Sequence, residues 1–292
     1  MASATASAAS ETALARRAPG ERDGLLYSVL VVIASLVFLV PAIGVLYTSL
    51  KTDTQIAEQG VWALTGNLTV DNYLEAFSSD GLLVYLRNSF LVTIPAVFLS
   101  VALGTLAGFV IAKLKPRGSA VLLVFFVSAL FIPPQILLIP LFQLFNAIGL
   151  YNTLWPMIIV HSAYGIAICT LVMRNFFVNV PDEILEAATV DGASVGRALW
   201  TIVLPLSRPA LAALATLQFT FIWNDFLYPL IFTRTESAQT IMVGIVNLQG
   251  QYSTAYGAQA AMSVIASVPT VLVFLIFQKQ FIAGLTTGAV KG

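Results

Sequence analysis

The sequence is poor in charge and has almost no cysteine or histidine. Of its 292 residues only 10% are charged, with 14 Lys and Arg against 14 Asp and Glu, and it holds one cysteine and one histidine. A net charge of zero provides no basic field for nucleic acid. A single cysteine excludes an intramolecular disulfide and a cysteine-based metal site. So little charge is typical of membrane proteins.

A nucleotide-binding P-loop is missing as well. Such a loop needs Gly-Lys before Ser or Thr to hold phosphates, and none of the lysines follows a glycine. No convergent set of polar residues suggests an enzyme active site either. We therefore expect no catalytic residue, metal site or cofactor in this chain, so that any ATP and Mg would be bound by a partner.

What the sequence does have is apolar length. Hydrophobic residues make up 58% of it, mean hydropathy is +0.90, and a spanning helix needs about 20 apolar residues. The chain is thus predicted to be an all-α integral membrane protein, with a disordered tail at 1–23 and one transmembrane domain at 24–292. Six helices are expected to span the membrane, at 25–47, 89–112, 119–145, 155–177, 209–232 and 260–281.

The distribution of Lys and Arg predicts the orientation, because these residues concentrate in cytoplasmic loops. With the N-terminus inside, eleven of them fall on the inner side, and the outer side receives only Lys51, Arg87 and Arg234. Both termini are therefore predicted to be cytoplasmic. The loop between the fourth and fifth spans then also lies inside.

That loop interrupts the apolar sequence with a charged stretch, "EILEAATVDGASVGRALWTIVLPLSRPAL" from Glu183 to Leu211. Acids after Pro181 predict a helix start. Gly192 predicts a left-handed turn, and Ser194 a cap for a second helix that Pro205 ends. The apolar side chains of the second helix form one stripe: Val195, Ala198, Leu199, Ile202 and Val203. These features leave two alternatives for residues 179–207, hereafter the polar segment: a projection that docks a protein, or a helix lying on lipid headgroups.

Within it, "EAATVDGASVGRALWTIVLPLSRP" resembles the cytoplasmic EAA loop in the permease subunits of importer-type ABC transporters. Four other stretches resemble the carbohydrate-uptake, maltose-permease-like branch of that family: "NSFLVT" at 88–93, "FIPPQILLIPLFQLFNAIGLYNT" at 131–153, "WNDFLYPL" at 223–230 and "GLTTGAVKG" at 284–292. The resemblance covers nearly all of 25–292. It implies the type I importer permease fold and a location in the inner or plasma membrane.

The resemblance also implies partners and contact residues. The partners are a second permease forming a heterodimer, two ATP-binding cassette ATPases, and an extracytoplasmic binding protein or lipoprotein that delivers a sugar or sugar derivative. Residues implied to couple the permease to the ATPases are Glu186, Ala187, Ala188, Asp191, Gly192, Ile202, Leu204 and Pro205. A binding-protein contact loop would use Gln249, Gln251, Tyr252 and Tyr256, and a C-terminal tail at 283–292, expected to be extended, would contact the ATPases through Gly288, Lys291 and Gly292.

Two polar residues lie within predicted spans. Asp225, with Trp223 and Asn224, either lines the translocation path or serves as a structural acid, since a carboxylate in a membrane needs a partner or a polar cavity. His161 is predicted to be a satisfied polar residue between helices, because the sequence around it offers no titratable neighbour for a proton relay.

Alternative functions remain at this level. The solute could be an amino acid, peptide or polyamine instead of a sugar. A secondary transporter would share the hydropathy pattern, but it needs ion-coupling groups within the membrane.

Overall fold

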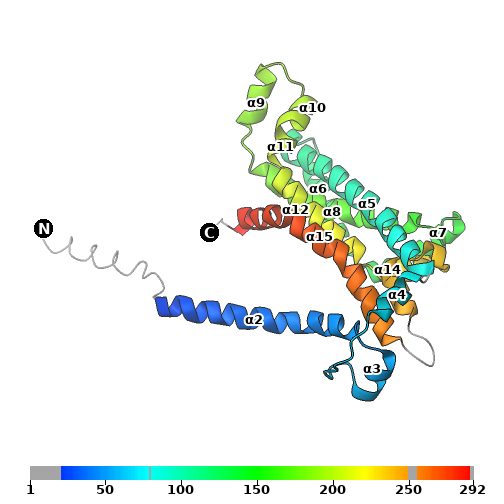
Figure 1. The fold of residues 1–292 in the computed structure, drawn as a ribbon. Coiled ribbons are helices and arrows are strands. Elements are labelled where there is room, and N and C mark those ends of the chain that lie inside the picture. Colours follow the sequence, from blue (N-terminus) through cyan, green and yellow to red (C-terminus); the bar gives the residue numbers. More distant parts are fainter. Residues whose placement is uncertain (1–20, 79, 249–254, 290–292) are drawn as a thin grey trace, which may run out of the picture.

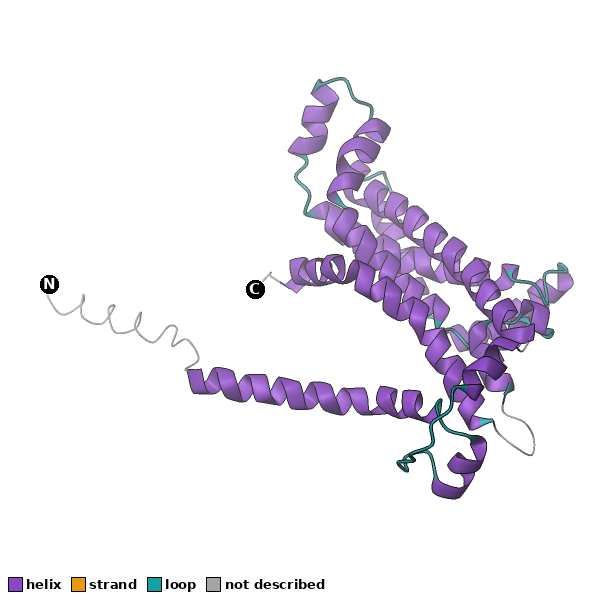
Figure 2. Cartoon of the chain, viewed as in Figure 1, coloured by secondary structure: helices purple, strands orange, loops and turns teal. Residues whose placement is uncertain are grey.

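The structure, a computed structural model, describes residues 21–78, 80–248 and 255–289. In this part of the chain every regular element is a helix (Figure 2). The helices and helical turns are α2 (Glu21–Thr48), α3 (Asp53–Gln59), α4 (Asp71–Ser78), α5 (Asp80–Phe109), η1 (Val110–Leu114), α6 (Ser119–Ala129), α7 (Pro134–Ala147), α8 (Trp155–Val178), α9 (Glu183–Val190), α10 (Val195–Ala198), η2 (Leu199–Val203), α11 (Leu204–Leu206), α12 (Arg208–Trp223), α13 (Leu227–Phe232), η3 (Glu236–Ala238), α14 (Ile241–Asn247) and α15 (Tyr256–Ala289).

Within these residues, four helical stretches are long and apolar enough to cross a membrane: Leu26–Thr48, Gly81–Leu114, Trp155–Val178 and Tyr256–Phe281. Two bent pairs raise the number to six if each pair forms one span. The pair α6 and α7 bends by 92°, and the pair formed by Val195–Leu206 and α12 bends by 75°. The chain is therefore a multi-pass membrane protein with four to six spans.

The fifth predicted span, 209–232, differs from the structure. The helix that begins at Arg208 ends at Trp223, and the short helix α13 follows after a break. The first span differs slightly too, because α2 is already helical at Glu21, inside the predicted tail. The rest of that tail, residues 1–20, lies outside the described residues.

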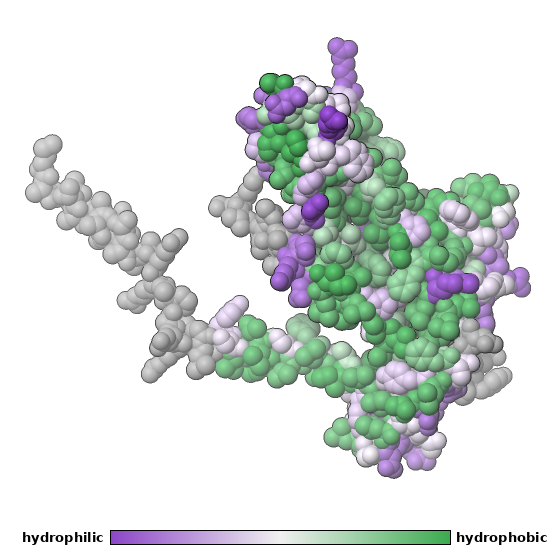
Figure 3. Space-filling model, turned by 45° about the horizontal axis from the view of Figure 1, so that its top comes forward, coloured by the Kyte–Doolittle hydropathy of each residue, from purple (hydrophilic) through white to green (hydrophobic). Residues whose placement is uncertain are grey.

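Helix α2 stands apart from the other long helices and meets them only near its C-terminal end, at α15 (Figure 1). Its residues from Leu26 to Ile43 are exposed. The space-filling view shows this arm as a nearly continuous apolar surface (Figure 3). Such a surface is compatible with lipid or with another apolar protein, and not with water.

The centre of the bundle is the contact between α5 and α8. It is close because glycines of α5 face α8: a Cβ on Gly104 would lie 2.4 Å from the Cβ of Cys169, and one on Gly108 would lie 2.8 Å from the backbone nitrogen of Arg174. The small residues of "SVALGTLAGF" thus allow the helices to approach closely, as small residues commonly do in membranes.

Two of the family-like stretches hold the connection from α13 to α14 in place. The Asn88 side chain donates to the backbone carbonyls of Ser237 and Gln239, each at 2.9 Å. The Asn152 Oδ1 accepts the backbone N–H groups of Arg234 at 2.8 Å and Thr235 at 3.0 Å. The side-chain amides of Asn88, which is buried, and of Asn152, which is half-buried, therefore pair backbone groups of this loop that would otherwise lack partners.

A buried lysine organises the connection between α2 and α4. The Lys51 side chain is fully buried, and its ammonium donates to the backbone carbonyls of Gly60, Val61 and Ala63. The ring of Tyr47 lies 4.7 Å from the same ammonium. A charge buried this deeply needs such partners, so Lys51 fixes the loop that carries α3.

At the C-terminal end, α15 remains helical up to Ala289. The expectation of an extended tail from residue 283 is therefore wrong for 283–289, because the small residues there continue the last turn of a long helix. The tail contacts at Lys291 and Gly292 lie outside the described residues, and Gly288 lies within α15.

Candidate functional site

The polar segment projects from one end of the bundle, opposite the end that carries α3 and α4 (Figure 1). Its first helix, α9, begins at Glu183, and its first turn carries the exposed acids Glu183 and Glu186. Acids at this position face the positive end of the helix dipole. Ala187 is exposed beside them, whereas Ala188 is buried at 6% exposure.

The turn after α9 has the conformation that the sequence predicts. Gly192 adopts φ +82°, and its N–H donates to the Thr189 carbonyl at 3.0 Å while Ala193 donates to Ala188 at 2.9 Å. These two bonds form a Schellman motif, in which glycine accommodates the left-handed residue without strain. Asp191 is the exposed residue directly before it.

The second helix is capped and anchored. Ser194 Oγ accepts the Arg197 N–H at 3.3 Å, which confirms the predicted cap. Leu199 and Val203, 6% and 0% exposed, belong to a buried cluster, hereafter the anchoring cluster. Its other buried members come from α5, η1, α8 and α12: Phe109, Ala112, Cys169, Met173, Phe177 and Leu214.

Pro205 does not end this helix, contrary to the prediction. The chain stays helical through Leu206 and bends only at Ser207. The π-helical segment η2 precedes Pro205, which occupies the first turn of α11. In a first turn a missing N–H costs little. Ile202 and Leu204 lie beside it and are half-buried.

Apolar side chains are also exposed on the projection. Val190 is 87% exposed and Trp200 is 68% exposed. Each lies on a helix of the polar segment, away from the anchoring cluster. The projecting lobe accordingly shows apolar and hydrophilic surface side by side (Figure 3). A mixed surface of this kind is typical of a protein contact.

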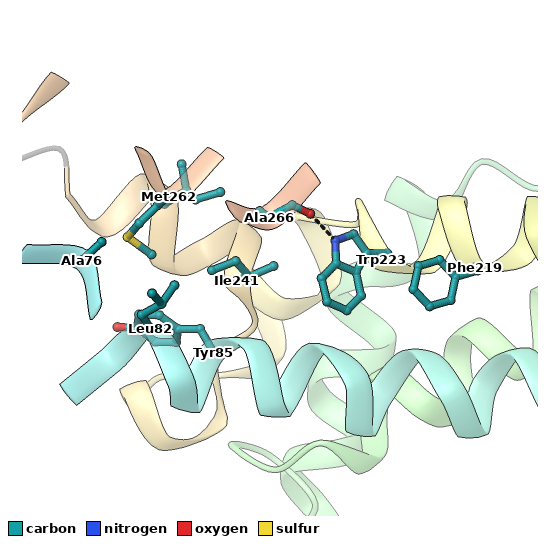
Figure 4. Packing of buried hydrophobic residues seen from close by; sticks show 9 residues of the cluster. Ala76, Leu82, Tyr85, Phe219, Trp223, Ile241, Met262 and Ala266 are labelled. Atoms are coloured by element: carbon teal, nitrogen blue, oxygen red, sulfur yellow. Dashed lines mark hydrogen bonds between the residues drawn. The ribbon is translucent and has the colours of Figure 1, made fainter. Parts of the chain in front are cut away.

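The predicted path residues differ sharply in exposure. Trp223 is 1% exposed, its Nε1 donates to the Ala266 carbonyl at 2.9 Å, and Phe219 stacks on it at 5.5 Å (Figure 4). Asn224 is exposed, and its amide donates to the Thr220 carbonyl at 2.8 Å. In this conformation Trp223 is therefore enclosed by protein, whereas Asn224 is accessible.

Asp225 lies in the break before the next helix, α13, which begins at Leu227. Its carboxylate accepts the N–H groups of Leu227 and Tyr228, each at 3.2 Å, and so caps the first turn of α13. This contact explains the break after Trp223. One carboxylate oxygen also lies 3.3 Å from Nε2 of His161, with side-chain exposures of 17% and 11%.

The prediction that His161 is a satisfied polar residue between helices is wrong in one respect, because its buried Nε2 has no hydrogen-bond partner in the part of the chain that the structure describes. Asp225 and the ring of Tyr228, 5.2 Å away, both face it across the bundle. The direction of Nε2 toward the carboxylate is not that of a hydrogen bond, and among the described residues Nε2 has no other acceptor or donor. No local pattern signals this pair, because α8 and the break between α12 and α13 are far apart in the chain.

At the other end of the bundle, Tyr256 is half-exposed at the start of α15. The remaining residues predicted to contact a binding protein, Gln249, Gln251 and Tyr252, lie outside the described residues. Gly257 next to Tyr256 donates its N–H to Asp53 of α3 at 3.0 Å. The beginning of α15 and helix α3 therefore form one surface.

Together these features define a helical, multi-pass membrane protein with a folded polar projection on one end. Residues 100–286 match the family described as binding-protein-dependent transport system inner membrane component. The chain therefore belongs to this family. Its members are transport subunits of the membrane, so the chain is a permease subunit and not an enzyme.

Relatives over most of the chain are permeases too. The chain is 32% identical to the sulfoquinovosyl glycerol transport system permease protein of Agrobacterium fabrum, over 87% of this chain and 89% of that one. It is 33% identical to the trehalose transport system permease protein of Mycobacterium tuberculosis, over 87% and 93%. A bacterial ABC transporter that imports alginate shares the fold, with a TM-score of 0.77 at 22% identity over 91% of this chain and 99% of that chain.

Proposed function

We propose that this chain is the membrane-spanning subunit of an ATP-driven importer for a sugar or sugar derivative, located in the inner or plasma membrane. Family membership together with relatives named for trehalose and sulfoquinovosyl glycerol transport supports this proposal most directly. A second fold neighbour is an alginate transporter in complex with a periplasmic protein carrying an alginate pentasaccharide. A binding protein that delivers a saccharide is thus the proposed partner outside, and both termini are inside.

The polar segment is the proposed contact with the ATPase subunits. It projects beyond the apolar bundle, it presents Val190 and Trp200, and it is anchored through Leu199 and Val203. The contact would centre on α9, whose exposed residues include Glu186, Ala187 and Asp191. ATP binding that draws two ATPase subunits together would then move this projection, and with it the helices of the anchoring cluster.

The translocation path is proposed to pass Asn224 and Asp225. Asn224 is exposed and Asp225 is partly exposed, so both can meet a hydroxylated solute in the assembled importer. Trp223 would support them from behind, because it is fixed by Ala266 and Phe219. A second permease subunit would supply the opposite wall of the path.

The test is to isolate the assembled complex from membranes and reconstitute it in liposomes with its binding protein. Uptake should require ATP and should be seen with a labelled disaccharide or oligosaccharide, and not with an amino acid, peptide or polyamine. Uptake driven by a sodium or proton gradient without ATP would overturn the importer. ATP-dependent uptake of an amino acid alone would retain the importer and overturn the sugar.

A further inference from the structure

A single carboxylate at the root of the polar segment is held by two lysines from another part of the chain. The Lys113 ammonium donates to Asp182 Oδ1 and to the backbone carbonyl of Val180. The Lys115 ammonium lies 3.7 Å from the other oxygen of Asp182. Both lysines come from the connection between α5 and α6, whereas Asp182 directly precedes α9.

The burial of the three side chains is unequal. The Lys113 side chain is 3% exposed, and those of Asp182 and Lys115 are 56% and 64% exposed. A nearly buried ammonium depends on its two oxygen partners, because they replace the water it has lost. The hydrogen bonds of Lys113 to Asp182 and Val180 are therefore costly to break, while Lys115 adds an exposed and weaker contact.

The backbone at Lys115 is unusual for a lysine. It adopts φ +45° directly after the π-helical segment η1, and its N–H donates to the Val110 carbonyl at 3.0 Å. Glycine favours this left-handed conformation, and other residues adopt it at a cost of about 1 kcal/mol. A glycine would relieve that strain but would remove the ammonium beside Asp182.

The ion contact is present throughout the range of ordinary pH. The hydrogen bond from Lys113, and then its charge, lower the pKa of Asp182 below its ordinary value of 3.8. A lowered carboxyl pKa means that the contact is complete above that ordinary value and is lost only as pH falls through the lowered one. The ionic contact between Lys113 and Asp182 is thus present at neutral pH and does not act as a pH switch.

We propose that Asp182, held by Lys113 and Lys115, is a positioning residue that makes the polar segment move together with α5 and α6. This inference rests on the proposed coupling function. Leu199 and Val203 anchor the second helix of the segment in the apolar cluster. The contacts of Asp182 with Lys113 and Lys115, hereafter the clamp, anchor the N-terminal end of its first helix. A displacement of α9 is then transmitted to the α5–α6 connection directly, in addition to the route through the anchoring cluster.

The first test measures hydrogen exchange in the complete complex in nanodiscs without nucleotide. Asp182→Asn keeps the shape and removes the charge, and Glu183→Gln is the matched control, because it removes the neighbouring exposed charge. In Asp182→Asn we expect amides 183–190 to exchange about three- to tenfold faster. Glu183→Gln loses only its interaction with the helix dipole and should change the exchange of these amides less, by about twofold. Equal exchange in the two variants overturns the clamp.

Should the Asp182→Asn complex fail to assemble, Lys115→Gln provides the milder variant, since its side chain is exposed. It should speed the exchange of the same amides about twofold. Unchanged exchange in Lys115→Gln would then overturn the clamp.

The second test measures whether a movement of α9 is transmitted to α6. A reporter Ala120→Cys stands exposed in the first turn of α6, and Cys169 is buried and does not compete for reagent. ATP with vanadate should change the thiol reactivity of the reporter in the parent complex, and Asp182→Asn should reduce that change at least about threefold, in line with the loss of a charge-assisted contact. An identical response in Asp182→Asn overturns transmission through the clamp.

The two arms separate the clamp from the proposed function. A parent complex that neither hydrolyses ATP nor responds to it at Ala120→Cys would overturn the importer and the transmission together. The exchange difference between Asp182→Asn and Glu183→Gln would still decide whether the clamp exists, because that arm uses no nucleotide.

Discussion

Replacing Gly192 by valine should uncouple the importer while leaving it assembled. Gly192 has φ +82°, and nothing lies within 4 Å of the position of an added Cβ. The substitution therefore acts through the backbone alone. A left-handed conformation costs an L-residue about 1–2 kcal/mol, and a β-branched one tolerates it least. This shifts the turn toward other conformations by about 5- to 30-fold.

Gly196 offers a matched control four residues further on. An added Cβ there also meets nothing within 4 Å, but Gly196 lies in α10 and has no positive φ. Valine and glycine differ by only a few tenths of a kcal/mol in helix propensity. Gly196→Val adds the same side chain to the same projection and should leave coupling intact.

The assay compares both variants in liposomes at equal amounts of assembled complex. For Gly192→Val we expect the ATP hydrolysis stimulated by the loaded binding protein, and the uptake, to fall about 5- to 30-fold, in proportion to the misplaced fraction of turns. Gly196→Val should resemble the parent. Full uptake with Gly192→Val would refute the coupling role, and equal losses in both variants would show that bulk, not the turn, was responsible.

Three further predictions concern other parts of the molecule. For topology, the cysteine in Leu64→Cys, at a position 88% exposed, should react with an impermeant thiol reagent in intact cells. The cysteine in Val190→Cys, at a position 87% exposed, should react only after permeabilisation, and the reverse pattern would invert the orientation. Asp225→Ala should lower the free energy of unfolding by about 1 kcal/mol, because two N–H groups lose their acceptor. Asp225→Asn keeps an acceptor oxygen, so it should be milder and change mainly uptake, through the charge lost beside the proposed path; equal melting temperatures of both variants and parent would contradict the cap. Lys51→Met should cost about 1–3 kcal/mol, because it removes the donor that joins the carbonyls of Gly60, Val61 and Ala63. The loss should be seen as protease cleavage within 52–70, and unchanged resistance would argue against this role of Lys51.

Local features of the polar segment could be predicted because their causes are local. A left-handed turn requires glycine within a few residues of a helix end, and a cap requires a hydroxyl two or three residues before the N–H it accepts. Gly192 and Ser194 carry these signals in the sequence itself. The same holds for the small residues of α5, since close helix packing depends on the absence of side chains.

Contacts between distant segments could not be predicted in this way. The apolar runs predict that His161 and Asp225 lie within spanning segments, but not that these segments bring the two side chains together. The break after Trp223 is not predicted, because "FIWNDFLYPL" is apolar apart from Asn224 and Asp225, and nothing in the sequence shows that the Asp225 carboxylate accepts the first N–H groups of a new helix. Lys113 and Asp182 carried one available signal, as opposite charges just beyond the inner ends of the second and fourth predicted spans.

The contacts that attach the polar segment to the bundle support its proposed role as a lever. Withdrawing Leu199 and Val203 from the anchoring cluster into water would cost about 1.5–3 kcal/mol each, whereas the exposed ionic contact of Lys115 is weak. A docked partner that pulls on α9 therefore moves the α5–α8 pair before it detaches the segment. That pair is itself stiff, because backbone meets backbone at Gly104 and Gly108 with no flexible side chain between them. A displacement of α9 would thus be passed on to α5 and α8 at the centre of the bundle. Helix α2 touches the bundle only at its C-terminal end, so it need not move with them.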